Sequence, residues 1–149
     1  MLMQPLHPPI SGTPHLSVLM ANYQAGEKIV PALRSVLGQS MGELEVIVID
    51  DASGDDTLAH VRDMMSADAR IRLVANPLNR GPAHCRNQAI AAARGEWIAI
   101  VDSDDIIHPE RFERLLALAG QSRAGIVADD LLLFHEDKSP PRLMLGGRR

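Results

Sequence analysis

The chain alternates short apolar runs with longer stretches in which apolar residues recur every three or four positions. The short runs end at glycine or at polar residues, and most contain β-branched side chains, a pattern typical of buried strands in a parallel sheet. They predict strands over 16–20, 44–49, 70–74, 97–101 and, longest of all, 125–134. The periodic stretches predict amphipathic helices. These helices are expected over about 27–37, 58–65 and 82–93, with a fourth that starts at Pro109.

The predicted elements follow the order βαβαβαβαβ. Strands and helices that alternate in this way form right-handed crossovers and a mostly parallel sheet with helices on both faces. The predicted fold class is therefore α/β, with a Rossmann-like sheet. In such a sheet, every loop that leads from a strand into a helix lies at the same edge. Four loops are expected to meet there, namely 21–24, 50–55, 79–81 and 102–105.

Composition and charge narrow the class of protein. The chain has 149 residues, of which 46% are hydrophobic and 23% are charged, as in one soluble globular domain. The formal net charge of -4 argues against a nucleic-acid partner. A lone cysteine, Cys85, leaves no internal disulfide and fits a reducing compartment. Prolines mark 1–15 as a loose tail, and 138–149 has no usable periodicity, so the domain is expected to cover 16–137.

The most unusual stretch is the acidic loop that follows the predicted strand 97–101. Three carboxylates lie within four residues, in Asp102, Asp104 and Asp105, with no Lys or Arg within five residues of them. Such a cluster is stable where water or a divalent cation compensates the charge, and oxygen ligands suit Mg²⁺ or Mn²⁺. The alternative is a solvated turn in which Asp104 or Asp105 caps the next helix.

Phosphate-bearing ligands commonly bind at this edge of an α/β sheet, and a metal that bridges carboxylate and phosphate would reconcile them with acidic loops. The glycine-rich phosphate loops are missing from the sequence. No G-x-G-x-x-G follows the first predicted strand, and no G-x-x-x-x-G-K occurs. Dinucleotide-binding and P-loop functions are therefore disfavoured.

Five segments, in this order and spacing, resemble inverting family 2 glycosyltransferases with the GT-A fold. The segments are 17–24 (SVLMANYQ), 35–40 (SVLGQS), 45–57 (EVIVIDDASGDDT), 79–87 (NRGPAHCRN) and 95–109 (GEWIAIVDSDDIIHP). The resemblance runs from residue 16 to about 134, which is most of the chain. Any one segment is weak support, whereas five in register are strong.

The resemblance implies where a nucleotide would bind. Asp51 is similar to the carboxylate that accepts a hydrogen bond from the base, typically from N3–H of uracil. Ala21, Asn22 and Tyr23 would line the same base pocket, with Tyr23 as a flat surface against the ring. The alternatives are that Asp51 closes a turn together with Asp50 and that Tyr23 is an ordinary loop aromatic.

The resemblance also implies a metal-binding D-x-D element. Asp102, Ser103 and Asp104 match it, so Asp104 would coordinate Mn²⁺ or Mg²⁺ on the diphosphate and Asp102 would reach the metal or the ribose. Ser103 would lie with them against the nucleotide. Three further residues are expected to hold the nucleotide or its phosphates, namely Asn79, Arg80 and Arg86. Arg86 lies within a predicted helix, so the alternative is that it supports neighbouring loops.

The chain departs from the family pattern after the fifth predicted strand. Enzymes of this kind carry an acceptor-binding half with a carboxylate that acts as general base within hydrogen-bond reach of the attacking hydroxyl. Here Ser139, Pro140 and Pro141 break regular structure, and Glu136 and Asp137 come too early to match that base. We therefore expect the donor-binding half, with the catalytic base outside this chain.

The implied activity is transfer of a sugar from a nucleotide-diphosphate sugar, with UDP favoured, to a hydroxyl of a glycan or lipid-linked acceptor by inverting displacement. Polysaccharide synthesis is the expected setting, in the cytoplasm or against the inner membrane face. Peripheral membrane association and a homodimer stay open. Two other classes remain as alternatives. One is a nucleotide-binding module without catalysis, and the other is an Asp-based phosphotransfer domain such as a phosphatase or receiver.

Overall fold

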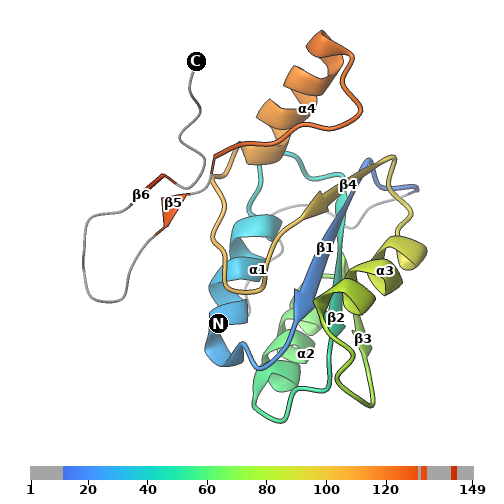
Figure 1. Ribbon diagram of the computed structural model, residues 1–149, viewed down its shortest axis with the longest axis vertical. Helices are drawn as coiled ribbons and strands as arrows, with labels where there is room; N and C mark the ends of the chain where they lie inside the picture. Colours follow the sequence, from blue (N-terminus) through green and yellow to red (C-terminus); the bar gives the residue numbers. More distant parts are fainter. Residues whose placement is uncertain (1–11, 131, 134–141, 144–149) are drawn as a thin grey trace. The chain divides into compact units, whose positions relative to one another are not determined.

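The computed structural model describes residues 12–130, 132–133 and 142–143 (Figure 1). The chain divides into two compact units, residues 1–111 and residues 112–149. The first unit contains the sheet and its helices. Each unit is described by itself.

Four parallel strands form the sheet of the first unit, among the residues that the structure describes. They lie in the order β3-β2-β1-β4. Their bounds are β1 Leu16–Asn22, β2 Leu44–Asp50, β3 Ile71–Ala75 and β4 Trp97–Ile100. Each lies within two residues of its predicted position, so the predicted α/β class and these four strands are confirmed.

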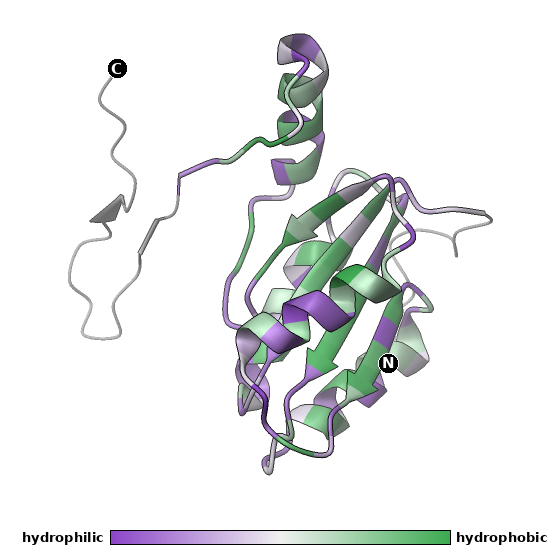
Figure 2. Ribbon diagram, turned by 45° about the vertical axis from the view of Figure 1, so that its right-hand side comes forward, coloured by the Kyte–Doolittle hydropathy of each residue, from purple (hydrophilic) through white to green (hydrophobic). Residues whose placement is uncertain are grey.

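Helices cover both faces of the sheet. The short 3-10 helix η1 (Gly26–Lys28) leads into α1 (Ile29–Leu37), and α2 (Thr57–Ala67) and α3 (Pro82–Ala92) follow. Helices α1 and α2 pack against each other on one face, whereas α3 packs on β1 and β2 from the other face (Figures 1 and 2). Pro82 begins α3, where its missing N–H and fixed φ are well tolerated.

The core follows from the alternation of side chains along the strands. Leu19, Ile47 and Ile49 are fully buried and pack with Cys85 and Ala89 of α3. Their neighbours in sequence point to the opposite face, toward α1 and α2, and are equally buried: Val18, Met20, Val46 and Val48. Figure 2 shows the strands as mostly hydrophobic, as expected for a sheet that is covered on both faces.

A buried polar cluster fixes the sheet at the amino ends of its strands. Glu45 is 1% exposed and accepts hydrogen bonds from Ser17 Oγ (2.8 Å), Arg94 Nη2 (2.8 Å) and Arg72 Nη1 (2.9 Å). Burial opposes ionisation of Glu45, but hydrogen bonds from Arg94, Ser17 and Arg72 outweigh it and lower its pKa to about 2. The Gly95 N–H donates to Ser17 Oγ (2.8 Å), which ties the start of β4 to β1.

The second unit differs from the sequence prediction. Helix α4 (Arg111–Ser122) begins two residues after Pro109, and Phe112 and Ala119 are its buried residues, as its apolar stripe predicts. Within the described residues, the predicted fifth strand over 125–134 is confirmed only at 132–133. Residues 125–130 have no strand structure, and Ile126 is 89% exposed. The two-residue strand β5 (Leu132–Leu133) instead pairs antiparallel with β6 (Arg142–Leu143). An apolar run becomes a strand only where a partner edge accepts its backbone.

Candidate functional site

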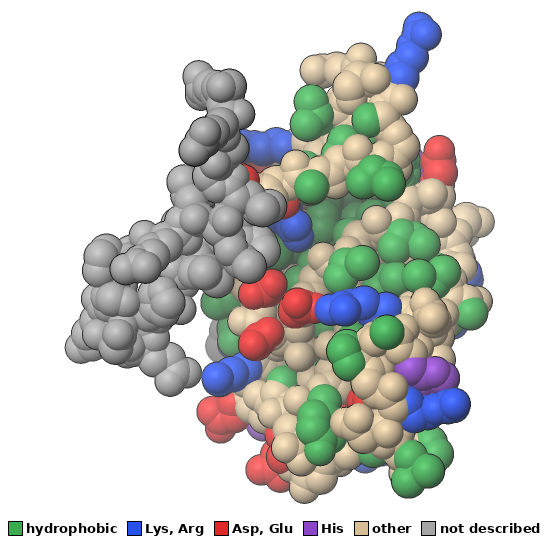
Figure 3. All heavy atoms as spheres, in the orientation of Figure 1, with side chains coloured by type: hydrophobic (Ala, Val, Ile, Leu, Met, Phe, Trp, Pro, Cys, Tyr) green, Lys and Arg blue, Asp and Glu red, His purple; other side chains and the backbone are tan. Residues whose placement is uncertain are grey.

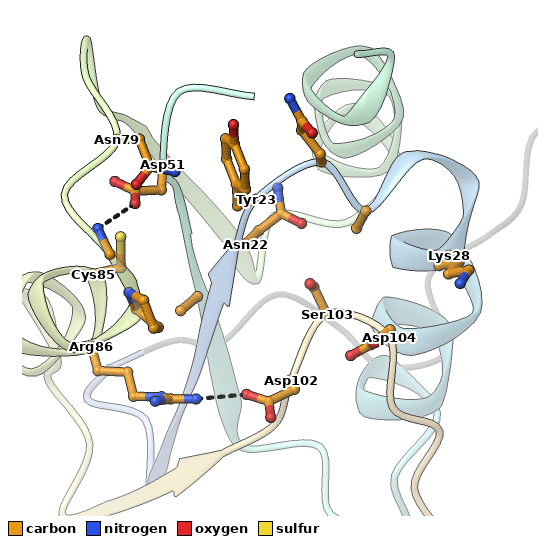
Figure 4. Close-up of a pocket in the computed structure, with 15 residues that line it drawn as sticks. Asn22, Tyr23, Lys28, Asp51, Asn79, Cys85, Arg86, Asp102, Ser103 and Asp104 are labelled. Carbon is orange, nitrogen blue, oxygen red and sulfur yellow. Dashed lines mark hydrogen bonds and ion pairs between the residues drawn. The ribbon is translucent and has the colours of Figure 1, made fainter. Parts of the chain in front are cut away.

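A pocket of about 640 Å³ opens at the carboxyl edge of the sheet, large enough for a nucleotide-sized ligand (Figure 4). Its lining comes from the loops after β1, β2 and β4, from the loop before α3 and from the first turns of α3. The lining residues are Ala21, Asn22, Tyr23, Gln24, Ala25, Lys28, Asp51, Asn79, Gly81, Pro82, Cys85, Arg86, Asp102, Ser103 and Asp104.

Asp51 lies at the end of this pocket next to the loop before α3 and is 3% exposed. Its carboxylate accepts hydrogen bonds from the backbone N–H groups of Arg80 (3.0 Å) and Gly81 (2.7 Å) and from Asn76 Nδ2 (3.3 Å). Burial alone would raise the pKa of Asp51, but these hydrogen bonds together lower it. Asp51 is therefore an ionised, buried hydrogen-bond acceptor at neutral pH.

The preceding residue, Asp50, holds the loops rather than lining the pocket. Its carboxylate accepts hydrogen bonds from Asn22 Nδ2 (2.6 Å) and Ser53 Oγ (2.6 Å). Ser53 Oγ in turn accepts the backbone N–H of Gln24 (2.8 Å), so the loop after β1 is fixed to the loop after β2. This network fixes the backbone beside Tyr23, whose side chain is 51% exposed at the pocket.

A second hydrogen-bond network joins Asp51 to α3 through Asn76. Asn76 and Gln88 exchange two amide hydrogen bonds (2.8 and 3.0 Å). Burial, followed by the nearby carboxylate of Asp51, raises the pKa of Cys85 to about 11. Cys85 is fully buried and stays a neutral thiol, which agrees with a core role and not with that of a nucleophile.

The acidic loop lies at the other end of the same pocket. Asp102 pairs with Arg86 of α3, with Nη2 and Oδ1 3.0 Å apart, while Ser103 is buried and Asp104 is exposed (Figure 4). Desolvation and the charges of Asp102 and Asp104 raise the pKa of Asp105 above its usual value, with Arg111 opposing them. In the space-filling view, acidic side chains gather beside a basic one over the region between α1 and α3 (Figure 3).

The acidic loop 102–105 can be tested for its fit to a divalent cation by the ligand atoms that it offers. Within the described part of the chain, no three His, Cys, Asp or Glu side chains gather closely enough to hold a metal ion by themselves. Asp102 and Asp104 both line the pocket and offer hard oxygen donors. Two carboxylates are what Mg²⁺ uses when substrate phosphates and water complete its coordination. The residues thus fit a metal that binds together with a phosphate-bearing ligand.

The predicted site residues are brought together, with one exception. All of them line the pocket except Arg80, whose backbone N–H contacts Asp51 while its side chain is exposed. Neither Asp104 nor Asp105 caps the next helix, because α4 begins only at Arg111.

Six lining residues were not among the predicted site residues, namely Gln24, Ala25, Lys28, Gly81, Pro82 and Cys85. Gln24 and Gly81 lie in the loops 21–24 and 79–81, which the predicted topology already places at this edge, and extending the first loop by one residue would have found Ala25. Gly81 and Pro82 form the start of α3, and Cys85 lies one turn further along it. Helix geometry places Cys85 on the same side as Pro82. No pattern in the sequence marks Lys28.

Comparison with known proteins identifies the family. Residues 17–145 match the family described as Glycosyl transferase family 2. The chain belongs to that family. Its membership agrees with the GT-A fold expected from the five sequence segments and gives no support to the phosphotransfer alternative. No helix in the described ranges is both long and apolar enough to cross a membrane.

One similar relative is the succinoglycan biosynthesis protein ExoO of Rhizobium meliloti (strain 1021). It is 42% identical over 124 residues, which are 83% of this chain and 35% of ExoO. The chain therefore spans about a third of the length of this relative.

Solved structures share the fold. S. aureus TarS 1-349 in complex with UDP-GlcNAc has a TM-score of 0.67 and 32% identity over 72% of this chain and 32% of TarS. The mannosyltransferase PcManGT from Pyrobaculum calidifontis, in complex with GDP-Man and Mn²⁺, has a TM-score of 0.67 and 26% identity. That match covers 78% of this chain and 35% of PcManGT. Both are GT-A glycosyltransferases.

Proposed function

We propose that this chain is the donor-binding part of a glycosyltransferase that transfers a sugar from a UDP-sugar to an acceptor hydroxyl with inversion. The observation that carries the proposal is the pocket at the carboxyl edge of the sheet. It has the buried, ionised Asp51 at one end and the carboxylates of Asp102 and Asp104 at the other. The UDP-GlcNAc complex of the similar TarS protein supports UDP as the nucleotide.

In this proposal the base of the nucleotide binds beside Asp51. A carboxylate offers about four lone-pair positions, and backbone N–H groups and Asn76 already occupy three of them. N3–H of uracil would take the remaining position. Ala21, Asn22 and Tyr23 line the walls, with the exposed Tyr23 ring available to stack on the base.

The diphosphate would lie toward the acidic loop. Asp102 and Asp104 would hold Mn²⁺ or Mg²⁺, which supplies positive charge to the departing diphosphate when bound. Arg86 and Asn79 line the same pocket and would hydrogen-bond phosphate or ribose oxygens. Ser103 is buried between the two aspartates and would position them. We assign Arg80 a backbone role only, since its N–H fixes Asp51.

The reaction is a single displacement at the anomeric carbon. The acceptor oxygen forms the new bond, the bond to the diphosphate breaks, and a base takes the proton of the attacking hydroxyl. The residues assigned here bind and orient the donor, and no general base is assigned among them. The similarity to a succinoglycan biosynthesis protein supports a role in polysaccharide synthesis. The proposed acceptor is a glycan or a lipid-linked glycan, and the proposed setting is the cytoplasmic face of a membrane.

Thermal unfolding with and without nucleotide tests the proposal. UDP with Mn²⁺ should raise the melting temperature, since a ligand at a hundredfold its Kd stabilises a protein by about 2.7 kcal/mol. UDP in EDTA should do so much less. Asp104→Asn should remove most of the difference between the two conditions, whereas Asp56→Asn, at the exposed N-cap of α2 outside the pocket, should preserve it. Well-folded protein that shows no shift with any nucleotide would contradict the proposal.

A further inference from the structure

One ion pair bridges the candidate site from α3 to the acidic loop. Arg86 Nη2 donates to Asp102 Oδ1 at 3.0 Å, and both residues line the pocket (Figure 4). Asp102 is also the first carboxylate of the proposed metal site. The carboxylate of Asp102 therefore has two competing partners, the guanidinium of Arg86 and the proposed divalent cation.

The Arg86–Asp102 ion pair is weak enough for Arg86 to exchange Asp102 for another anionic partner. The side chain of Arg86 is 36% exposed and that of Asp102 is 51% exposed, and an ion pair this accessible to water adds little to stability. The contact runs through one guanidinium nitrogen rather than a bidentate fork. Arg86 Nε is buried and has no hydrogen-bond partner within the described residues. The guanidinium therefore has donor capacity that Asp102 does not use.

The positive charge of Arg86 lowers the affinity of the two aspartates for a divalent cation. Asp102 and Asp104 carry two negative charges, and Arg86 cancels one of them. A divalent cation that arrives alone must share Asp102 with a guanidinium that repels it. A diphosphate brings further negative charge to the metal and offers Arg86 another anionic partner. Metal binding should therefore be weak without the diphosphate and strong with it.

We propose that Arg86 couples metal binding to nucleotide binding by holding Asp102 until a diphosphate arrives. In this arrangement Arg86 is a positioning residue for Asp102, and the cation binds together with the nucleotide rather than before it. The inference rests on the proposed function of the pocket, and it adds an order of binding to it.

Mn²⁺ titrations test the coupling, with free Mn²⁺ measured by electron paramagnetic resonance in the absence and presence of saturating UDP. In the wild-type protein, UDP should tighten Mn²⁺ binding at least tenfold. Arg86→Met should bind Mn²⁺ alone about three- to tenfold more tightly than wild type and gain less from UDP. Arg86→Lys retains the positive charge and should resemble wild type in Mn²⁺ alone. Arg62→Met removes the same charge from the exposed side of α2 and should also match wild type.

Two results overturn the inference while leaving the proposed function intact, provided that wild-type protein binds UDP with Mn²⁺. One is an Arg86→Met protein whose affinity for Mn²⁺ alone equals or falls below that of wild type. The other is an equal rise in Arg86→Lys, because the retained charge should prevent it. If the wild-type protein binds neither UDP nor Mn²⁺, the proposed function fails and the inference fails with it.

Discussion

Gly95 lies directly against the backbone of Ser17. A Cβ atom added to Gly95 would lie 2.5 Å from the Ser17 backbone nitrogen and 2.7 Å from the carbonyl carbon of Leu16. Real Cβ atoms do not approach backbone atoms this closely, and backbone in the central strand β1 has little room to move. The close approach lets the Gly95 N–H reach Ser17 Oγ and sets where β4 begins.

Gly95→Ala should therefore destabilise the first unit by about 3 kcal/mol, as overpacking of a tight site does. The measurement is the free energy of unfolding in urea at pH 7, followed by circular dichroism. Gly54→Ala is the control, because a Cβ on Gly54 meets nothing within 4 Å. Its free energy of unfolding should stay within about 0.5 kcal/mol of wild type. Equal stability of the two variants would contradict the packing argument.

Glu45 should make the stability of the protein sensitive to acid. Its pKa is lowered to about 2 in the folded state, and the ordinary value of a glutamate is about 4.3. A lowered pKa contributes stability that is present above the unfolded value and is lost as the pH falls toward the folded value. The contribution should therefore disappear between about pH 4.3 and pH 2.

Glu45→Gln removes the charge and retains the shape. At pH 7 it should cost about 2 kcal/mol, after allowance for solvent screening by partly exposed arginine partners. The difference from wild type should shrink as the pH falls from about 4.3 toward 2. Urea unfolding at several pH values measures it. Glu43→Gln changes an exposed neighbour and should show a small difference that does not follow this trend.

The elements that were predicted correctly are those whose signal is local. The run around Leu19 and the run around Ile47 are apolar enough to specify buried strands without reference to the rest of the chain. Residues 125–130 contain three apolar residues in a row followed by Asp129 and Asp130, and strand formation there would need a partner edge, which a local pattern does not report. The same limit explains why only β5 remains of the predicted strand over 125–134 and why β6 was not predicted.

The candidate site was largely predictable, because parallel topology brings the ends of β1, β2 and β4 to one edge. Arg80 shows that a sequence pattern does not specify the backbone conformation of a loop. Gly81 adopts a positive φ of 88°, and the resulting turn presents the backbone N–H groups of residues 80 and 81 to Asp51. Residue type predicted that the Arg80 guanidinium would hold the nucleotide, but it could not predict that the Arg80 backbone N–H holds Asp51.

Cys85 gives a direct probe of the integrity of the pocket, because it is the single cysteine of the chain. It is fully buried and its pKa is raised to about 11. At pH 8 the native thiol should react with iodoacetamide at least about 100-fold more slowly than the urea-unfolded chain, since the thiolate is the reactive form. Mass spectrometry of timed samples measures the rate. Rapid labelling of native protein would show that the thiol is accessible and ionised.

Asp51 should select the nucleotide base. An ionised carboxylate only accepts hydrogen bonds, so it favours uracil, which presents N3–H, over cytosine, whose N3 is itself an acceptor. In calorimetric titrations with Mn²⁺, the wild-type protein should bind UDP about 100-fold more tightly than CDP. Asp51→Asn offers an N–H as well as a carbonyl oxygen and should bring the UDP-to-CDP ratio toward one.

The ratio matters because Asp51 also fixes the loop of Arg80 and Gly81 through hydrogen bonds of 3.0 and 2.7 Å. Collapse of that loop in Asp51→Asn would weaken UDP and CDP alike and leave the ratio near the wild-type value. Asn76→Ala is the matched control, because it removes one hydrogen bond to Asp51 and retains the carboxylate. It should weaken both nucleotides while preserving their ratio. If Asp51→Asn keeps the wild-type ratio of UDP to CDP affinity, the role of Asp51 is to hold the loop and not to recognise the base.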